Sequence, residues 1–306
     1  MGKKIISLLL AAALMVTTMG MAAAAVPDTV QGKLAMLEVD TYGAEQTGAV
    51  MDRLNKLEKD YDGKHREGSL MARVDALYRE LYTNGSEPSL LAELNAVEWN
   101  IGHEVSMKPL ETRLADMELG LLGKTGEGTF KARISKLGKA SFGTEKIPME
   151  HVQVPANTLI KVALVDRVNA KNLKAGDKVR YKVAEDVLVD GSLVFAKGEP
   201  GEGTVEKVRQ AKNFGRNAEV QIDFNKTKSI DGTEIETYVG EESKQEMKNL
   251  AMAAGASVAG MLLLGPIGII GGAFVKGKNI DLPEGTELYI QTQNEENLYG
   301  VATVQQ

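Results

Sequence analysis

SLMARVDALYRELYTNGSEP, residues 69–88, is one copy of a unit that recurs every 20 residues between Leu34 and Gly143. A fixed period over several units is typical of a repeat array. In this copy the apolar residues at 70, 74, 77 and 81 form one stripe of a helix of about 14 residues. The corresponding blocks begin at Leu34, Leu54, Val74, Leu94, Leu114 and Ile134.

Each unit also carries signals for a helix start and for a turn. Ser69, Ser89 and Thr129 can cap the first turn, and Pro109 occupies the equivalent place. The expected turn residues are Gly43, Gly63, Gly123 and Gly143, with Asn84-Gly85 or Gly102 in the other units. A turn in every block excludes a continuous coiled-coil rod. Because the apolar stripe is narrow, each helix needs a neighbour, which is either another repeat or another molecule.

Charged residues recur at two positions of the unit. An arginine precedes most block starts, with Glu93 in its place in one unit, and a glutamate stands at the fifth position. The arginines are Arg53, Arg73, Arg113 and Arg133, and the glutamates are Glu38, Glu58, Glu98 and Glu118. The two positions are five residues apart and do not share a face of one helix. This pattern favours a solvated charged face, and pairing between helices is the alternative.

The N-terminus has the pattern of a secretory signal peptide. Lys3 and Lys4 precede an apolar stretch from Ile5 to Val16, and an A-x-A pattern ends at Ala25. We expect cleavage after Ala25, with a retained membrane anchor as the alternative. No cysteine follows the apolar stretch, so a lipoprotein is not expected.

Composition narrows the class of partner. The whole chain has a formal net charge of −6 from 36 basic and 42 acidic residues. Removing Lys3 and Lys4 with the leader leaves 34 basic and 42 acidic residues, a net charge of −8. This balance disfavours a nucleic-acid partner and suits an extracytoplasmic protein. The chain has no cysteine, so its core depends on burial alone.

Residues from Val154 onward favour strands. Short β-prone runs alternate with turn signals such as Asp190-Gly191 and Asp231-Gly232. The stretches VPANTLI (154–160) and LPEGTEL (282–288) echo each other, so we expect the chain to leave the sheet and return with a last strand. We predict an α+β chain in which an array of short helical repeats precedes a small antiparallel β-barrel or sandwich. The expected divisions are 1–25 signal peptide, 26–33 linker, 34–143 repeats, 144–153 linker, 154–292 β-domain with an insertion at 250–275, and 293–306 tail.

The insertion from Leu250 to Val275 contains 26 residues without a charge. Its length permits a membrane span, but Gly265-Pro266 should break a helix in the middle. Three interpretations remain: a membrane-inserted helical hairpin, a single tilted span, and a glycine-rich hairpin buried against protein or in an oligomer. The candidate contact residues are Gly255, Gly260, Gly265, Pro266, Gly268, Gly271 and Gly272.

Catalytic motifs are weak. His65, His103 and His151 lie in no zinc-binding or triad pattern, so we expect no metal and no cofactor. Gly123-Lys124-Thr125 lacks the earlier glycine of a phosphate-binding loop. The sequence therefore predicts a protein that is not an enzyme. Trp99, the single tryptophan, is a candidate partner anchor or a packing residue.

Two regions resemble known families. The repeats of 34–143, with their R-[LVI]-x-x-[LM]-E pattern, resemble repeats of bacterial cell-envelope proteins often labelled peptidoglycan-binding. Residues 152–240, with VPANTLIKVAL, DVLVDGSLVFAKG and GTVEKV, are similar to the VirB10/TrbI-type secretion-channel barrel, although Asn157 replaces its usual glycine. The second resemblance implies a barrel that assembles with other envelope components.

Together these features predict a non-catalytic, exported protein of the periplasm, envelope or cell surface. It would tether or assemble envelope components through its repeats and its glycine-rich hairpin. The expected partners are other envelope proteins or a second copy of the chain, with the membrane or peptidoglycan as further candidates. The alternative is a soluble glycan- or peptide-binding module.

Overall fold

The computed structural model describes residues 29–144, 146–210, 218–253, 273–277 and 280–303. Six helices of 13 residues come first, and each begins 20 residues after the last. They are α1 (Val30–Tyr42), α2 (Val50–Asp62), α3 (Leu70–Tyr82), α4 (Leu90–Gly102), α5 (Leu110–Leu122) and α6 (Phe130–Phe142). The helical repeats expected from the sequence period are therefore present, although α1 begins inside the segment expected to be a linker.

The helix ends follow the local sequence. The hydroxyl groups of Ser69, Ser89 and Thr129 each accept a hydrogen bond from a backbone N–H in the first helical turn. Left-handed glycines end four of the described helices, at Gly43, Gly63, Gly123 and Gly143. Glycine suits this position because it has no Cβ to clash in the left-handed conformation.

The array closes on itself. Helix α1 contacts α3 and α5, and α2 contacts α6, so early repeats pack against late ones. The rings of Tyr61 and Phe130, on α2 and α6, meet edge to face at 5.1 Å. The block-start residues at 34, 54, 74, 94, 114 and 134 are all at most 1% exposed. The neighbour that each narrow stripe needs is thus supplied within this chain.

The β-domain is built around a closed antiparallel barrel of six strands. The strands follow one another in the order β8-β7-β4-β2-β12-β9, and β9 pairs with β8 again to close the ring. Their bounds are β2 (Leu159–Leu164), β4 (Lys178–Val183), β7 (Pro200–Arg209), β8 (Ala218–Lys228), β9 (Glu234–Tyr238) and β12 (Glu287–Thr292). Inward residues such as Ile160, Val162 and Ile290 are fully buried, as strand alternation requires.

One side of the barrel carries two further elements. Strand β10 (Ala273–Gly277) pairs with the first half of β8, while β9 pairs with its last residues. Helix α7 (Glu241–Ala253) packs on β12. Met247 of α7 is 4% exposed and belongs to the barrel core.

A second sheet departs from the expected boundaries. It has the order β1-β13-β6-β5, from β1 (Met149–Val154), β13 (Glu296–Ala302), β6 (Ser192–Phe195) and β5 (Val187–Val189). Strands β1 and β13 pair along their whole length, although the sequence placed one in a linker and the other in a tail. Each strand is a short run whose partner lies more than 140 residues away. A short strand pair, β3 (Val168–Asn169) with β11 (Asp281–Leu282), completes the domain.

The two echoing stretches form matching turns. Asn157 and Gly285 both have positive φ, at 67° and 79°. Thr158 and Thr286 each donate their hydroxyl to the carbonyl of the proline three residues earlier, at 2.7 Å. Asparagine tolerates the left-handed conformation, which explains how it replaces glycine in the first copy. The strands that follow, β2 and β12, pair with each other, so the expected return of the chain to the sheet is confirmed.

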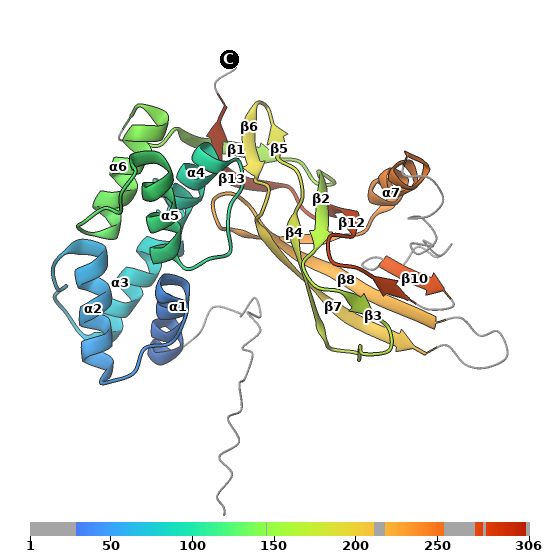
Figure 1. Ribbon diagram of the computed structural model, residues 1–306, viewed down its shortest axis with the longest axis horizontal. Coiled ribbons are helices and arrows are strands. Elements are labelled where there is room, and N and C mark those ends of the chain that lie inside the picture. The colour runs from blue at the N-terminus through green and yellow to red at the C-terminus, as the bar shows by residue number, and fades with distance from the viewer. Residues whose placement is uncertain (1–28, 145, 211–217, 254–272, 278–279, 304–306) are drawn as a thin grey trace, which may run out of the picture.

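The array and the β-domain share a core. Leu193, Ala196, Ile230 and Val301 of the β-domain pack in the same apolar cluster as the helices. Along the longest axis of the molecule, the array occupies one end, and α7 and β10 lie at the other (Figure 1).

Candidate functional site

The recurring arginines and glutamates form a ladder of ion pairs between successive helices. Each arginine binds the glutamate 15 residues earlier, so Arg73 on α3 binds Glu58 on α2. Its Nε and Nη2 donate to the two carboxylate oxygens at 2.9 and 2.5 Å. The same pairing joins Arg53 to Glu38, Arg113 to Glu98 and Arg133 to Glu118. The solvated face favoured by the sequence is therefore wrong, and the alternative of pairing between helices is confirmed.

These pairs, here called clasps, also fix the loops. Glu58 accepts the backbone N–H of Arg66, eight residues on, at 3.1 Å. The equivalent loop N–H groups of the other clasps belong to Gln46, Ser106 and Gly126. Burial opposes the ionisation of Glu58, but Arg73 and the Arg66 N–H outweigh it and lower the pKa of this carboxyl. A clasp therefore joins two helices and the loop between them with one carboxylate.

One rung of the ladder is missing from the described array, between α3 and α4. Tyr78 stands where the glutamate would be, and Glu93 stands where the arginine would be. The loop that follows α3 begins at Thr83 with an extended backbone, without a left-handed glycine. The loop between α3 and α4 therefore differs from the other loops both in sequence and in structure.

That loop docks the array on the β-domain. Asn84 donates its amide to the carbonyl of Asp231 and to Thr233 Oγ1, at 3.0 and 3.2 Å. Tyr299 of β13 donates its hydroxyl to the Gly85 carbonyl at 3.0 Å. Polar groups of the loop replace the clasp and connect the two parts of the chain.

Helix α4 and the loop after it make further contacts with the β-domain. Asn95 is 3% exposed and donates to the Ile230 carbonyl at 3.0 Å. The backbone N–H of Val105 donates to the Lys197 carbonyl at 2.8 Å. Glu104 pairs with both Lys182 and Lys197, and these partners lower the pKa of its carboxyl. The interface therefore combines hydrogen bonds and ion pairs with the shared apolar cluster.

Trp99 lies at the same interface. Its indole N–H donates to Asp186 of the β-domain at 2.9 Å, and its ring meets His103 edge to face at 5.7 Å. The partly buried side chain packs against the helical core. Its contacts with this chain's own β-domain match the packing role considered from the sequence. Anchoring of a separate partner by Trp99 stays a prediction.

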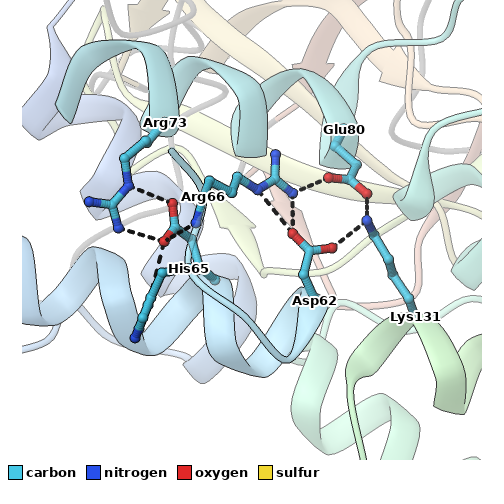
Figure 2. Close-up of polar contacts among 7 residues, drawn as sticks. Asp62, His65, Arg66, Arg73, Glu80 and Lys131 are labelled. Carbon is cyan, nitrogen blue, oxygen red and sulfur yellow. Dashed lines mark hydrogen bonds and ion pairs between the residues drawn. The ribbon is translucent and has the colours of Figure 1, made fainter. Parts of the chain in front are cut away.

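A network of charged side chains links the second and third helices of the array to the sixth (Figure 2). Arg66 binds Asp62 through Nε at 2.9 Å and also binds Glu80 on α3. Lys131 on α6 pairs with both of these carboxylates. Burial opposes the ionisation of Asp62, but Lys131 and Arg66 outweigh it and lower the pKa of Asp62. The network joins α2, α3 and α6, so it holds the second repeat against the last.

The candidate contact residues of the insertion lie outside the described residues. This holds for Gly255, Gly260, Gly265, Pro266, Gly268, Gly271 and Gly272. The first and last residues of the insertion belong to described elements, since α7 extends to Ala253 and β10 begins at Ala273. Among the described helices, none is long and apolar enough to cross a bilayer.

Titratable groups in the described parts of the chain do not converge on a metal site. His65 lies 3.7 Å from Glu58 at the edge of a clasp, and His151 stacks on Tyr299 with ring centroids 4.1 Å apart (Figure 2 shows the first). Asp223 lies on β8, and burial with the nearby Glu206 raises its pKa to about 6.

The burial of one acidic residue, Glu199, could not be predicted from the sequence. Glu199, in the turn from β6 to β7, is 2% exposed and lies at the interface with the array. The sequence held no signal for its burial, because it stands in the acidic, glycine-rich run Gly198–Gly203, which is typical of a solvated loop. The α4–α5 loop contacts this turn at the neighbouring Gly198.

Comparisons with known proteins add little to this picture. No protein-family model matches the chain, and no curated protein matches it. Among solved structures, the chain is similar to ComB10 of the Com type IV secretion system of Helicobacter pylori. The identity is 14%, the TM-score is 0.26, and the match covers 47% of this chain and 88% of that one. A likeness this low carries no argument about function.

Proposed function

We propose that this chain is a non-catalytic structural protein of the bacterial cell envelope that tethers or assembles other components. The leader-like residues 1–25 support export, and the uncharged segment 250–275 supports attachment to a membrane or to further protein. The helical array and the barrel act as one body, because they share an apolar cluster and several hydrogen bonds.

The observation that carries this proposal is the placement of the elements that bracket the uncharged segment. Helix α7 is fixed to β12, where Ser243 donates its hydroxyl to Gln291 at 2.9 Å. Strand β10 is fixed to β8 by five successive residue pairs. Both elements lie at the end of the molecule remote from the array (Figure 1).

This placement supports a hairpin over a single span. A single span would carry α7 and β10 to opposite sides of a bilayer, yet both pack on the same barrel. A hairpin leaves and re-enters one side, so it agrees with both attachments. The array then projects away from the attached end and is free to contact a partner.

Cell fractionation tests the proposal. We expect the full-length protein, expressed with its leader, to stay with the membrane fraction after high-salt and carbonate washes. A matched variant replaces residues 254–272 with a glycine-serine linker of equal length and should wash off. Release of the unaltered protein by carbonate would refute membrane attachment. Retention of the linker variant would assign attachment to another part of the chain.

The mass of both proteins in solution separates the two kinds of hairpin. If the segment joins copies of the chain, the unaltered protein forms oligomers that the linker variant loses. A monomer that washes off membranes would contradict both forms of the proposal.

A further inference from the structure

Glu199 carries a buried carboxyl that lacks a hydrogen-bond partner at one oxygen. It is 2% exposed, and its Oε1 has no hydrogen-bond partner among the described residues. An ionised carboxylate in such a place loses its hydration without replacement, which is costly. Burial accordingly raises the pKa of Glu199 to about 8.

Two cations and two carboxylates act on this carboxyl. Arg113 of α5 and Lys228 of β8 attract its ionised form, whereas Glu98 of α4 and Asp231 of the β8–β9 turn repel it. Arg113 already binds Glu98 at 2.6 Å. The two cations also attract Asp40 of α1. The positive charge near Glu199 is thus shared among other carboxylates and does not compensate its burial.

The turn that carries Glu199 lies in close contact with the array. The neighbouring Gly198 has φ of +94°, and a Cβ on it would lie 2.0 Å from the Val105 carbonyl oxygen. The Val105 N–H donates to the Lys197 carbonyl at 2.8 Å in the same contact. The α4–α5 loop therefore covers the β6–β7 turn at backbone contact distance.

We propose that Glu199 is a proton-dependent latch between the array and the barrel. Its neutral form permits the closed interface, and its ionised form favours separation of the α4–α5 loop from the β6–β7 turn. The proposal is independent of membrane attachment, because it concerns only contacts within the chain.

The direction follows from the two protonation equilibria. In the open form Glu199 is solvated and titrates near its ordinary value of 4.5, while in the closed form it titrates at about 8. The closed form therefore holds the proton more tightly, and raising the pH between these values favours opening. One proton corresponds to about a tenfold change in the open-to-closed ratio per pH unit. Below pH 4.5 and above pH 8 this contribution becomes constant.

Hydrogen exchange at the Val105 amide tests the latch in the full chain. The exchange rate of the unaltered protein is divided by that of Glu199→Gln at each pH, which removes the chemical pH dependence of exchange. We expect this ratio to rise by up to about tenfold per pH unit between about pH 5 and 8. Asp223→Asn, which removes another carboxyl whose pKa is raised, on β8, should leave the rise intact. A ratio that does not change with pH would overturn the proposal.

A second measurement does not depend on the variant folding. Carbon-13 NMR of glutamate side chains in the unaltered protein should show one carboxyl titrating near pH 8, with Val105 exchange following the same midpoint. If every glutamate titrates below about pH 6, the latch is wrong. If one titrates near pH 8 without a change at Val105, the carboxyl is buried but does not control the interface, and the proposal fails.

Discussion

Removing the arginine of one clasp should destabilise the protein far more than removing an exposed cation. In Arg73→Ala, the carboxylate of Glu58 loses both of its guanidinium hydrogen bonds, at 2.9 and 2.5 Å. The side chain of Glu58 is 0% exposed and that of Arg73 is 8% exposed, so the remaining charge is buried. Breaking a buried pair from one side costs about 3–5 kcal/mol. Glu58 keeps the Arg66 N–H, so we expect a loss of about 3 kcal/mol.

Urea unfolding followed by circular dichroism measures this loss against two matched variants. Lys108→Ala breaks a pair whose side chains are 58% and 51% exposed, so it should cost far less than Arg73→Ala. The double variant Glu58→Leu/Arg73→Met removes both charges. It should lie within about 1 kcal/mol of the unaltered protein or exceed it, because an apolar pair avoids desolvation of the charges.

The three variants together show whether an unpaired buried charge causes the loss of stability. If Arg73→Ala costs no more than Lys108→Ala, the clasps do not hold the repeats together. If the double variant is as unstable as Arg73→Ala, an unpaired buried charge is not the cause of the loss.

Three further predictions concern pH, the interface and one glycine. The pKa values of Glu58 and Glu118 are lowered in the folded state, so their contribution to stability is complete above the ordinary value of 4.5 and is lost as the pH falls through the lowered values. Urea unfolding curves from about pH 6 to 3 should show this loss, and Glu58→Gln should reduce it. Asn95→Ala leaves the Ile230 carbonyl and Arg113 without their amide partner and should cost about 2–3 kcal/mol in the same assay. Asn55→Ala, at the same repeat position but binding Arg73 alone in the described contacts, should cost less, and equal losses would contradict a special role of the interface. Gly198→Ala forces a Cβ to within 2.0 Å of the Val105 oxygen at positive φ, so Val105 amide exchange should accelerate at least about tenfold, a change of roughly 1.4 kcal/mol. Unchanged exchange would refute the close contact.

Local signals in the sequence predicted the elements and their ends. The 20-residue period placed six helices, and Ser69, Ser89 and Thr129 cap helices as expected. The Asp190-Gly191 hairpin is present between β5 and β6, with positive φ at both residues. These features depend on the backbone preferences of residues that are close together in the chain.

Pairing between distant residues could not be predicted in the same way. Spacing within one unit was uninformative for Arg73, because the residue five positions later is Tyr78 and the true partner is Glu58, 15 residues earlier on another helix. The residues of β1 were expected to form a linker, because the strand that pairs with them, β13, begins far away in the chain at Glu296. Such pairs depend on how whole elements pack, which periodicity within one element does not report.

The sequence by itself determined the repeat, its helices and the turns, because caps and apolar spacing act within a few residues. Tertiary structure decided that the narrow stripes close on one another, and that the irregular loop between Tyr78 and Glu93 docks the array on the β-domain. It also decided the burial of Glu199, an acidic loop residue in the sequence. Burial depends on what packs around a residue, and the charged groups near Glu199, such as Arg113 and Lys228, come from distant parts of the chain.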